Sequence, residues 1–132
     1  MYIDNITIEK INTVLHANKN VLFAYLFGSQ AKKTATPLSD IDVAAYLACK
    51  PDGDTRLEIL GSLIDILKTD HIDLVILNKA FLSLKIRVLK SNRLILDNAP
   101  FIRHAFESAT MRISIDFARF ENRILKQRFL NG

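Results

Sequence analysis

The sequence predicts an α/β fold, in which helices pack on a small mixed sheet of about four strands and a long helix closes the chain. Short apolar runs of strand length alternate with segments whose apolar residues recur at helical spacing. Hydrophobic residues make up 49% of the 132 residues, and Gly and Pro are few, which excludes a disordered chain. The length fits one globular unit, so we expect residues 1–132 to form a single domain.

Four segments are expected to be strands. The first, residues 21–27, is a continuous apolar run that Gly28 ends abruptly. Side chains alternate between faces along a strand, so each of the other three expected strands should place a set of apolar side chains on one face. These sets are Ile41, Val43, Ala45 and Leu47 in residues 39–47, Ile72, Leu74 and Ile76 in residues 71–78, and Leu94 and Leu96 in residues 93–97.

Helices are expected at residues 7–18, 55–68, 81–91 and 100–130. The second follows a turn at residues 51–54, in which aspartates are expected to cap the helix. In the third, Leu82, Ile86 and Leu89 are expected to face inward.

The last helix is long and carries an apolar seam at spacings of four and three. A domain of this size can hardly cover such a helix along its whole length, so we expect its distal half to dock on a partner chain or in a homo-oligomer. Basic residues flank that half and would suit an acidic partner. The seam comprises Ile102, Phe106, Ala109, Ile113, Phe117, Phe120 and Ile124, and the basic residues are Arg112, Arg119, Arg123, Lys126 and Arg128.

The net charge of +4 is unevenly distributed. Residues 1–79 carry eight Lys and Arg against ten Asp and Glu, whereas residues 80–132 carry ten against four. A basic half of this kind is compatible with nucleic acid, an acidic protein, a triphosphate, or simply a solvated helix face. The single Cys49 cannot form an internal disulfide, and no apolar run approaches the length of a membrane span, so we expect a cytoplasmic protein without a membrane partner.

Two short motifs point to phosphate and metal chemistry. Glycine at the turn of Gly28-Ser29 lets the backbone approach an anion, and the following N–H groups with the Ser29 hydroxyl can donate to phosphate oxygens. After ten intervening residues, Asp40 and Asp42 are expected to project from one face of a strand. Two like charges side by side are best tolerated around a divalent cation, and hard oxygen ligands suit Mg²⁺. The alternative is a common turn followed by solvated aspartates at a strand edge.

Asp73 is a candidate third carboxylate. If its strand lies next to the strand of Asp42, the side chains converge on one face. Two metal ions held in this way can stabilise the attacking and leaving oxygens of an in-line displacement. His71 would share this face, where it could orient a carboxylate or remain a surface residue at the strand end.

Three segments together resemble the signature of the polymerase beta nucleotidyltransferase superfamily, and specifically its minimal members, the MNT or MntA-type antitoxins that are encoded beside HEPN-type toxins. These segments are YLFGS at residues 25–29, PLSDID at residues 37–42 and DLVILN at residues 73–78. The resemblance covers about the first hundred residues, and its central motif is specific to the superfamily rather than to the subfamily.

The resemblance implies a single nucleotidyltransferase domain that moves AMP from ATP onto a hydroxyl of a HEPN ribonuclease toxin, expected to be a tyrosine, and so neutralises the toxin. Gly28 and Ser29 would then hold the triphosphate, Asp40 and Asp42 would bind two Mg²⁺ ions, and Asp73 would bind the metal on the acceptor side. The toxin is expected to dock on the C-terminal helix.

Two alternatives stay open. One is nucleotide transfer to a small molecule such as an aminoglycoside, which normally requires an additional domain to build the acceptor pocket. The other is a non-catalytic antitoxin that inhibits its partner by binding alone. The sequence also departs from many relatives at Lys32-Lys33, which stand where an Arg-Gly pair is usual and either alter the path of the loop or add a phosphate contact.

Overall fold

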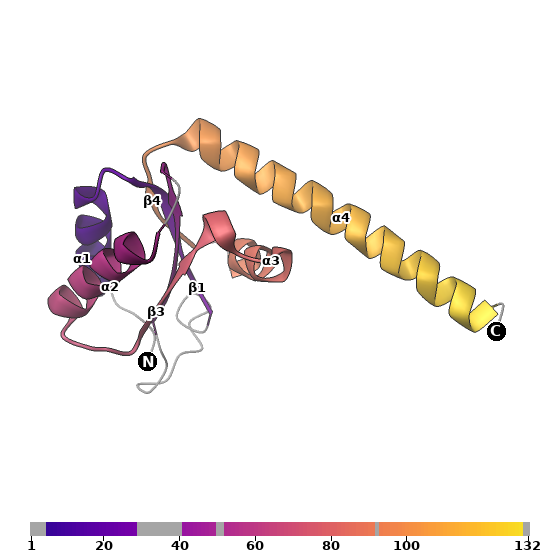
Figure 1. The fold of residues 1–132 in the computed structure, drawn as a ribbon, viewed down its shortest axis with the longest axis horizontal. Helices are drawn as coiled ribbons and strands as arrows, with labels where there is room; N and C mark the ends of the chain where they lie inside the picture. The colour runs from indigo at the N-terminus through magenta and orange to yellow at the C-terminus, as the bar shows by residue number, and fades with distance from the viewer. Residues whose placement is uncertain (1–4, 29–40, 50–51, 92, 131–132) are drawn as a thin grey trace.

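The α/β prediction is confirmed by the computed structural model, which describes residues 5–28, 41–49, 52–91 and 93–130, with side chains up to residue 124. Four strands form one mixed sheet within these ranges, and helices lie on both of its faces (Figure 1). In chain order the elements are α1 (Asn5–Ala17), β1 (Val21–Phe27), β2 (Ile41–Leu47), α2 (Gly53–Leu67), β3 (Ile72–Ile76), the 3₁₀ helix η1 (Leu77–Lys79), α3 (Leu82–Ser91), β4 (Arg93–Asp97) and α4 (Pro100–Leu130).

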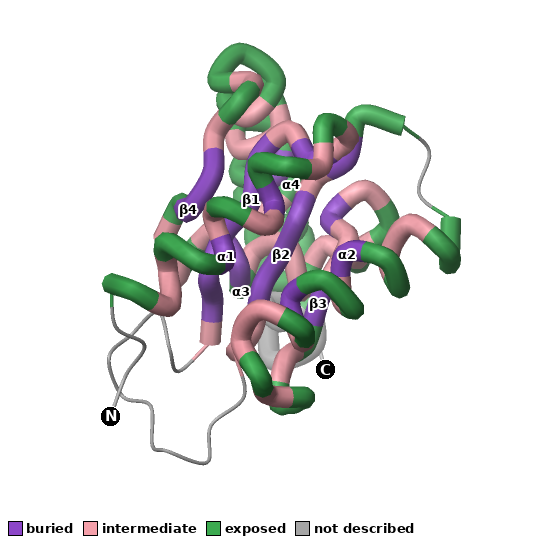
Figure 2. Tube along the Cα trace, turned by 90° about the vertical axis from the view of Figure 1, so that its left-hand side faces the viewer, coloured by how far each residue is buried: buried purple, intermediate pink, exposed green. Residues whose placement is uncertain are grey.

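The strand order in the sheet is β3-β2-β1-β4. β1 runs antiparallel to both β2 and β4, whereas β2 and β3 are parallel and are joined through α2. A parallel pair needs a long crossover, and α2 supplies it. β1 is almost wholly buried and β2 is buried along most of its length, as expected for strands covered on both faces (Figure 2).

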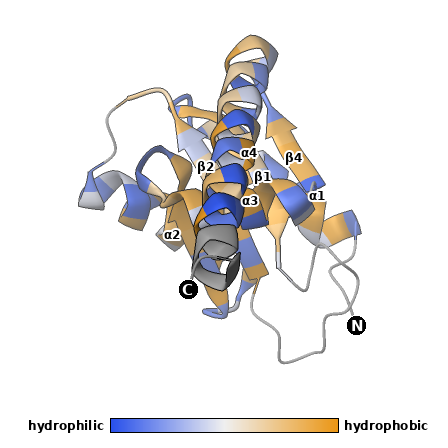
Figure 3. Cartoon of the chain, turned by 90° about the vertical axis from the view of Figure 1, so that its right-hand side faces the viewer, coloured by the Kyte–Doolittle hydropathy of each residue, from blue (hydrophilic) through white to orange (hydrophobic). Residues whose placement is uncertain are grey.

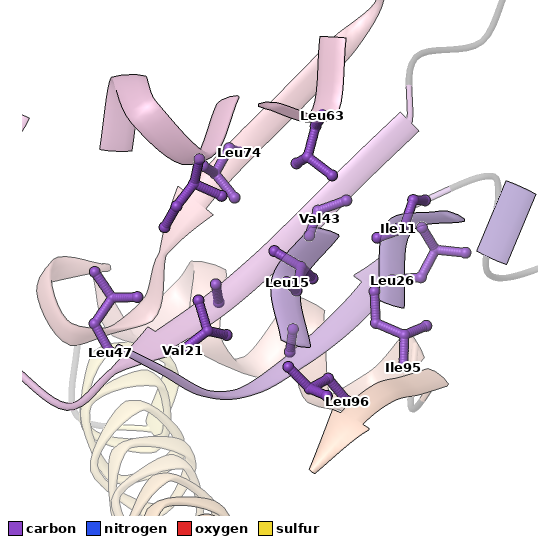
Figure 4. Close-up of a cluster of buried hydrophobic side chains, with 13 residues drawn as sticks. Ile11, Leu15, Val21, Leu26, Val43, Leu47, Leu63, Leu74, Ile95 and Leu96 are labelled. Atoms are coloured by element: carbon purple, nitrogen blue, oxygen red, sulfur yellow. The ribbon is translucent and has the colours of Figure 1, made fainter. Parts of the chain in front are cut away.

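Two apolar clusters occupy the two faces of the sheet. Helices α1 and α2 cover one face and enclose the larger cluster, to which they contribute Ile11, Leu15 and Leu63 (Figure 4). Helix α3 and the first turns of α4 cover the opposite face, which we call the α3 face. The alternation predicted for residues 41–47 and 71–78 is confirmed, because Val43 and Leu74 belong to the first cluster and Ala44, Val75 and Leu77 to the second.

The prediction that Leu94 and Leu96 share one face of the last strand is wrong. The register between β1 and β4 shifts between Ala24 and Tyr25, which indicates an irregularity of the β-bulge type. As a result Ile95 and Leu96 are both buried in the first cluster, whereas Leu94 is 39% exposed.

For the helices, the predicted inward residues of α3 need correction, whereas the predicted capping of α2 by an aspartate is confirmed. The fully buried residue of α3 is Val88, which the sequence did not single out, whereas Leu82 and Ile86 are only half-buried. Helix α2 begins at Gly53 because Asp52 caps it, accepting a hydrogen bond of 2.7 Å from the Thr55 N–H. The hydrogen bonds that Thr55 donates, first from its N–H, hold the pKa of the exposed Asp52 carboxyl below its usual range.

Helix α4 is anchored to the body through its first three turns. The ring of Phe106 packs against Phe23 and Tyr46, with centroids 5.6 and 5.3 Å apart. Arg103 pairs with Asp97 at 2.9 Å and with Glu107, which accepts a hydrogen bond from the Tyr25 hydroxyl at 3.0 Å. Burial, and after it the charge of Glu107, raises the pKa of Tyr25, so this tyrosine stays neutral and serves as a donor.

The distal part of α4 leaves the body and extends into solvent (Figure 1). Thr110 is buried, whereas nearly every residue from Met111 to Ile124 is exposed. In the part of the chain that the structure describes, no helix has both the length and the apolar character needed to span a bilayer.

Phe106→Ala and Phe117→Ala make the same change at an anchored and at a projecting position of α4. We expect Phe106→Ala to lower the free energy of unfolding by about 2 kcal/mol or more, because it removes ring contacts with Phe23 and Tyr46. Phe117→Ala should change it by less than about 0.5 kcal/mol. Urea unfolding followed by circular dichroism checks both, and equal effects would contradict the division of α4 into two parts.

Candidate active site

Phe27, Asp42 and Asp73 form a row across β1, β2 and β3 at one end of the sheet. Asp42 lies opposite Phe27 of β1 in the antiparallel pair and next to Asp73 of β3 in the parallel pair. Neighbouring strands lie about 4.8 Å apart, so the two carboxylates start from backbone positions within that distance. The condition on which the role of Asp73 depended is met, because its strand lies next to that of Asp42. The hydrogen bond from the Ile41 N–H to the His71 carbonyl, at 2.8 Å, extends the pairing by one residue.

Both carboxylates project from the α3 face. Asp42 and Asp73 stand two residues before Ala44 and Val75, which belong to the cluster on that face. Asp42 is half-buried and Asp73 is exposed, so the row opens from the core toward solvent at β3. His71 has an exposed side chain, and its Nε2 lies 3.8 Å from the exposed carboxylate of Asp70.

Gly28 brings the turn after β1 against the Asp42 carboxylate. Its φ of +74° lies in the left-handed region that side chains rarely adopt. A Cβ at this position would collide with Oδ2 of Asp42. Glycine is therefore required here twice, for the backbone conformation and for the space that the carboxylate occupies.

The other predicted site residues lie outside the described residues. These are Ser29 and Asp40, and the same holds for Lys32-Lys33. Their roles stay predictions, as do the metal-binding roles of Asp42 and Asp73. Among the residues that the structure describes, no three His, Cys, Asp or Glu side chains gather as a metal site. The pair Asp42 and Asp73 nevertheless fits Mg²⁺, which is usually held by one or two carboxylates together with substrate phosphates.

The Asn78 of the DLVILN segment has a structural task that the sequence did not reveal. Its side-chain amide accepts a hydrogen bond from the Leu47 N–H at 2.8 Å and donates one to the Leu47 carbonyl at 2.9 Å. It thereby completes the backbone pairing of β2 where β3 has already ended. This contact fixes the far end of the strand that carries Asp42.

Cys49 and a hollow beside α1 and α2 have no part in this site. Cys49 is a free, exposed thiol beyond the end of β2 that is remote from Asp42. The hollow, of about 450 Å³, is lined by residues that include Asn18, Thr55 and Glu58 and lies on the side of α1 and α2. The α3 face is therefore the place where two carboxylates and a glycine turn can act together.

The fold is a nucleotidyltransferase fold. The family model described as Polymerase beta, Nucleotidyltransferase matches residues 9–100, from α1 to the first residue of α4. The chain belongs to this family, and the match includes Gly28, Asp42 and Asp73.

Several solved structures share this fold over nearly the whole chain. A toxin-antitoxin crystal structure with AMP-PNP is 26% identical, with a TM-score of 0.75 and coverage of 92% of this chain and 98% of the other. A mutant of the toxin-antitoxin MntA-HpeT is 27% identical, with a TM-score of 0.72 and coverage of 92% and 96%. The structure of a tri-AMPylated Shewanella oneidensis HEPN toxin in complex with MNT antitoxin contains a chain that is 23% identical to this one. Its TM-score is 0.71, with coverage of 94% of this chain and 97% of the other, and at this identity the likeness shows the fold alone. No curated protein matches the chain.

Gly28→Ala is expected to damage both the fold and the site, because it strains the backbone at φ +74° and displaces the Asp42 carboxylate. We expect a loss of about 1–3 kcal/mol in the free energy of unfolding. Gly61→Ala is the matched control, since a Cβ at Gly61 in α2 meets nothing within 4 Å and should stabilise the helix by up to about 1 kcal/mol. Thermal unfolding of both variants checks the difference in sign, and a neutral Gly28→Ala would contradict the contact.

Proposed function

We propose that this protein is an antitoxin that transfers AMP from ATP to a hydroxyl group of a HEPN-type toxin, expected to be a tyrosine hydroxyl. The observation that supports it most is the contact of the Gly28 turn with the Asp42 carboxylate, beside Asp73. A phosphate seat and two carboxylates on one face are the parts that nucleotidyl transfer needs. Membership of the family and likeness to a toxin-antitoxin structure with AMP-PNP add support.

In this proposal Gly28 and Ser29 hold the triphosphate through backbone N–H groups and the Ser29 hydroxyl. Asp40, Asp42 and Asp73 are the ligands for two Mg²⁺ ions, which would neutralise charge on the attacking and leaving oxygens. The acceptor oxygen attacks the α-phosphorus of ATP, the bond to the bridging oxygen breaks, and pyrophosphate leaves. Asp73, as the exposed member of the row, faces the acceptor and takes part in removing the hydroxyl proton.

The toxin is proposed to dock on the projecting part of α4. We call Ile113, Phe117, Phe120 and Ile124 the distal stripe; all four are exposed at spacings of four, three and four. Phe106 and Thr110 begin the same line and pack on the body, so the stripe continues a surface that is already used for packing. Figure 3 shows hydrophobic and hydrophilic segments alternating along α4.

The charges beside the distal stripe favour an acidic partner. Arg112, Arg119 and Arg123 outnumber Asp116 and Glu121 in the described part of this surface. A second copy of the helix would bring the same excess of positive charge, whereas an acidic partner would complement it, so a homo-oligomer is the less favoured occupant. The proposal also places the reaction in the cytoplasm, where ATP is available.

Asp42→Asn is expected to abolish transfer while leaving the fold intact, because it removes a metal ligand and also one of two neighbouring negative charges. The protein is incubated with α-labelled ATP, Mg²⁺ and the product of the adjacent gene, which the proposal expects to be a HEPN-type toxin, and label on that product is measured. Asp65→Asn, an exposed change on α2, is the control and should keep full activity.

Tight binding of the toxin without label on it would show inhibition by occlusion and would overturn the proposed reaction. Label on an added aminoglycoside instead of the toxin would indicate the small-molecule alternative. A large fall in the thermal stability of Asp42→Asn would contradict its assignment as a metal ligand.

Phe117→Glu is expected to weaken toxin binding roughly tenfold or more, because it places a charge in the middle of the distal stripe. Phe101→Glu is the control, since Phe101 is also exposed on α4 but lies in its first turn, outside the stripe. Calorimetric titration with the toxin and, separately, with ATP checks both. Equal losses for the two variants, or a parallel loss of ATP binding, would contradict docking on the stripe.

A further inference from the structure

Arg87 on α3 lies beside the candidate active site, although it is remote from it in sequence. Its guanidinium carbon is 5.9 Å from the centroid of the Phe27 ring. Phe27 is the last residue of β1, is followed by Gly28, and is paired with Asp42. The guanidinium is therefore held at the end of the sheet at which the glycine turn and the two carboxylates meet.

Arg87 also belongs to a helix on the same face of the sheet as the two carboxylates. Residues of α3 pack with Phe27, Ala44 and Leu77 in the cluster on the α3 face, from which Asp42 and Asp73 project. Helices α1 and α2 lie on the other side of the sheet, as Figure 1 shows. Arg87 thus approaches the row of Phe27, Asp42 and Asp73 from the side on which a nucleotide would bind.

The contact with Phe27 positions the Arg87 side chain without neutralising its charge. The Phe27 ring is buried, whereas Arg87 is exposed, and a cation–π contact at an exposed site contributes only about 0.5–1 kcal/mol. The ion pairs between described residues involve His71 and Arg103 and leave Arg87 without a carboxylate partner in that set. Its charge remains available for an anionic ligand.

The other cations of α3 are placed differently. The ammonium group of Lys85 lies 5.8 Å from the ring centroid of Phe106, which packs on Phe23 near the start of β1. It therefore points toward the far end of the strand. Lys90 is exposed near the end of α3, and no ring contact involves it within the described residues.

We propose that Arg87 binds a phosphate group of the nucleotide and acts as a positioning residue; this inference rests on the proposed function. A planar guanidinium can make two parallel hydrogen bonds to phosphate oxygens, which a lysine ammonium cannot reproduce. A triphosphate brought against two carboxylates meets strong repulsion, and a cation fixed on Phe27 offsets part of it.

The test measures the binding of ATP and of adenosine, each with Mg²⁺, to the full chain and to three variants by calorimetry or competition. Arg87→Ala should weaken ATP binding about tenfold or more, because a hydrogen-bonded charge pair is lost, and should leave adenosine binding unchanged. Arg87→Lys should fall between this variant and the unaltered protein. Lys90→Ala, which removes one positive charge from the same helix, should bind ATP normally.

Unchanged ATP affinity in Arg87→Ala would overturn the proposal. An equal loss of ATP and adenosine binding, together with a lower melting temperature, would also overturn it, because that result would mean that Arg87 has a structural role. Arg87→Lys keeps the test decisive if Arg87→Ala does not fold, since full ATP affinity in the lysine variant would exclude guanidinium binding. If the unaltered protein does not bind ATP, the proposed function itself fails, and that result is distinct from ATP binding that ignores Arg87.

Discussion

The close approach of Gly28 to the Asp42 carboxylate is the constraint on which the site depends. Because a Cβ at Gly28 has no room, the turn after β1 can lie against the strand that carries the aspartate. The register of the sheet adds the second carboxylate, since the pairing of β2 with β3 sets Asp73 beside Asp42 on the same face. A glycine turn and two carboxylates are thus brought together by backbone geometry.

The two faces of the sheet divide the work of the fold. On one face, α1 and α2 enclose an apolar cluster that stabilises the fold by packing. On the other, α3 and the first turns of α4 leave the end of β1 to β3 open, where Asp42 is half-buried and Asp73 exposed. The network of Arg103, Asp97, Glu107 and Tyr25 fixes α4 by its beginning, so its distal part projects away from the sheet. Chemistry and partner recognition can thus occupy different elements.

Period-two alternation made much of this predictable. Ile41 to Leu47 and Ile72 to Leu77 assign their aspartates to a face without any knowledge of the fold, and Gly28 marks the strand end. The faces of Leu94 and Ile95 were not predictable, because they depend on a register shift that exists only once β4 pairs with β1. The position of Arg87 beside Phe27 was not predictable for a similar reason, since it is set by how α3 packs on the sheet and not by the local sequence pattern. The motifs and the resemblance predict one site for Gly28 and Asp42 but not their direct contact, which depends on the backbone conformation at Gly28.

A crystal of the protein soaked with Mn²⁺ and AMP-PNP tests the central claim, that Gly28, Asp42 and Asp73 belong to one metal-dependent nucleotide site. Mn²⁺ takes the same oxygen ligands as Mg²⁺ and can be located by its anomalous scattering. The account predicts an anomalous peak within coordination distance of both the Asp42 and the Asp73 carboxylates, with the phosphates of AMP-PNP lying against the backbone at Gly28. A nucleotide bound elsewhere, or a metal that engages neither carboxylate, would contradict it.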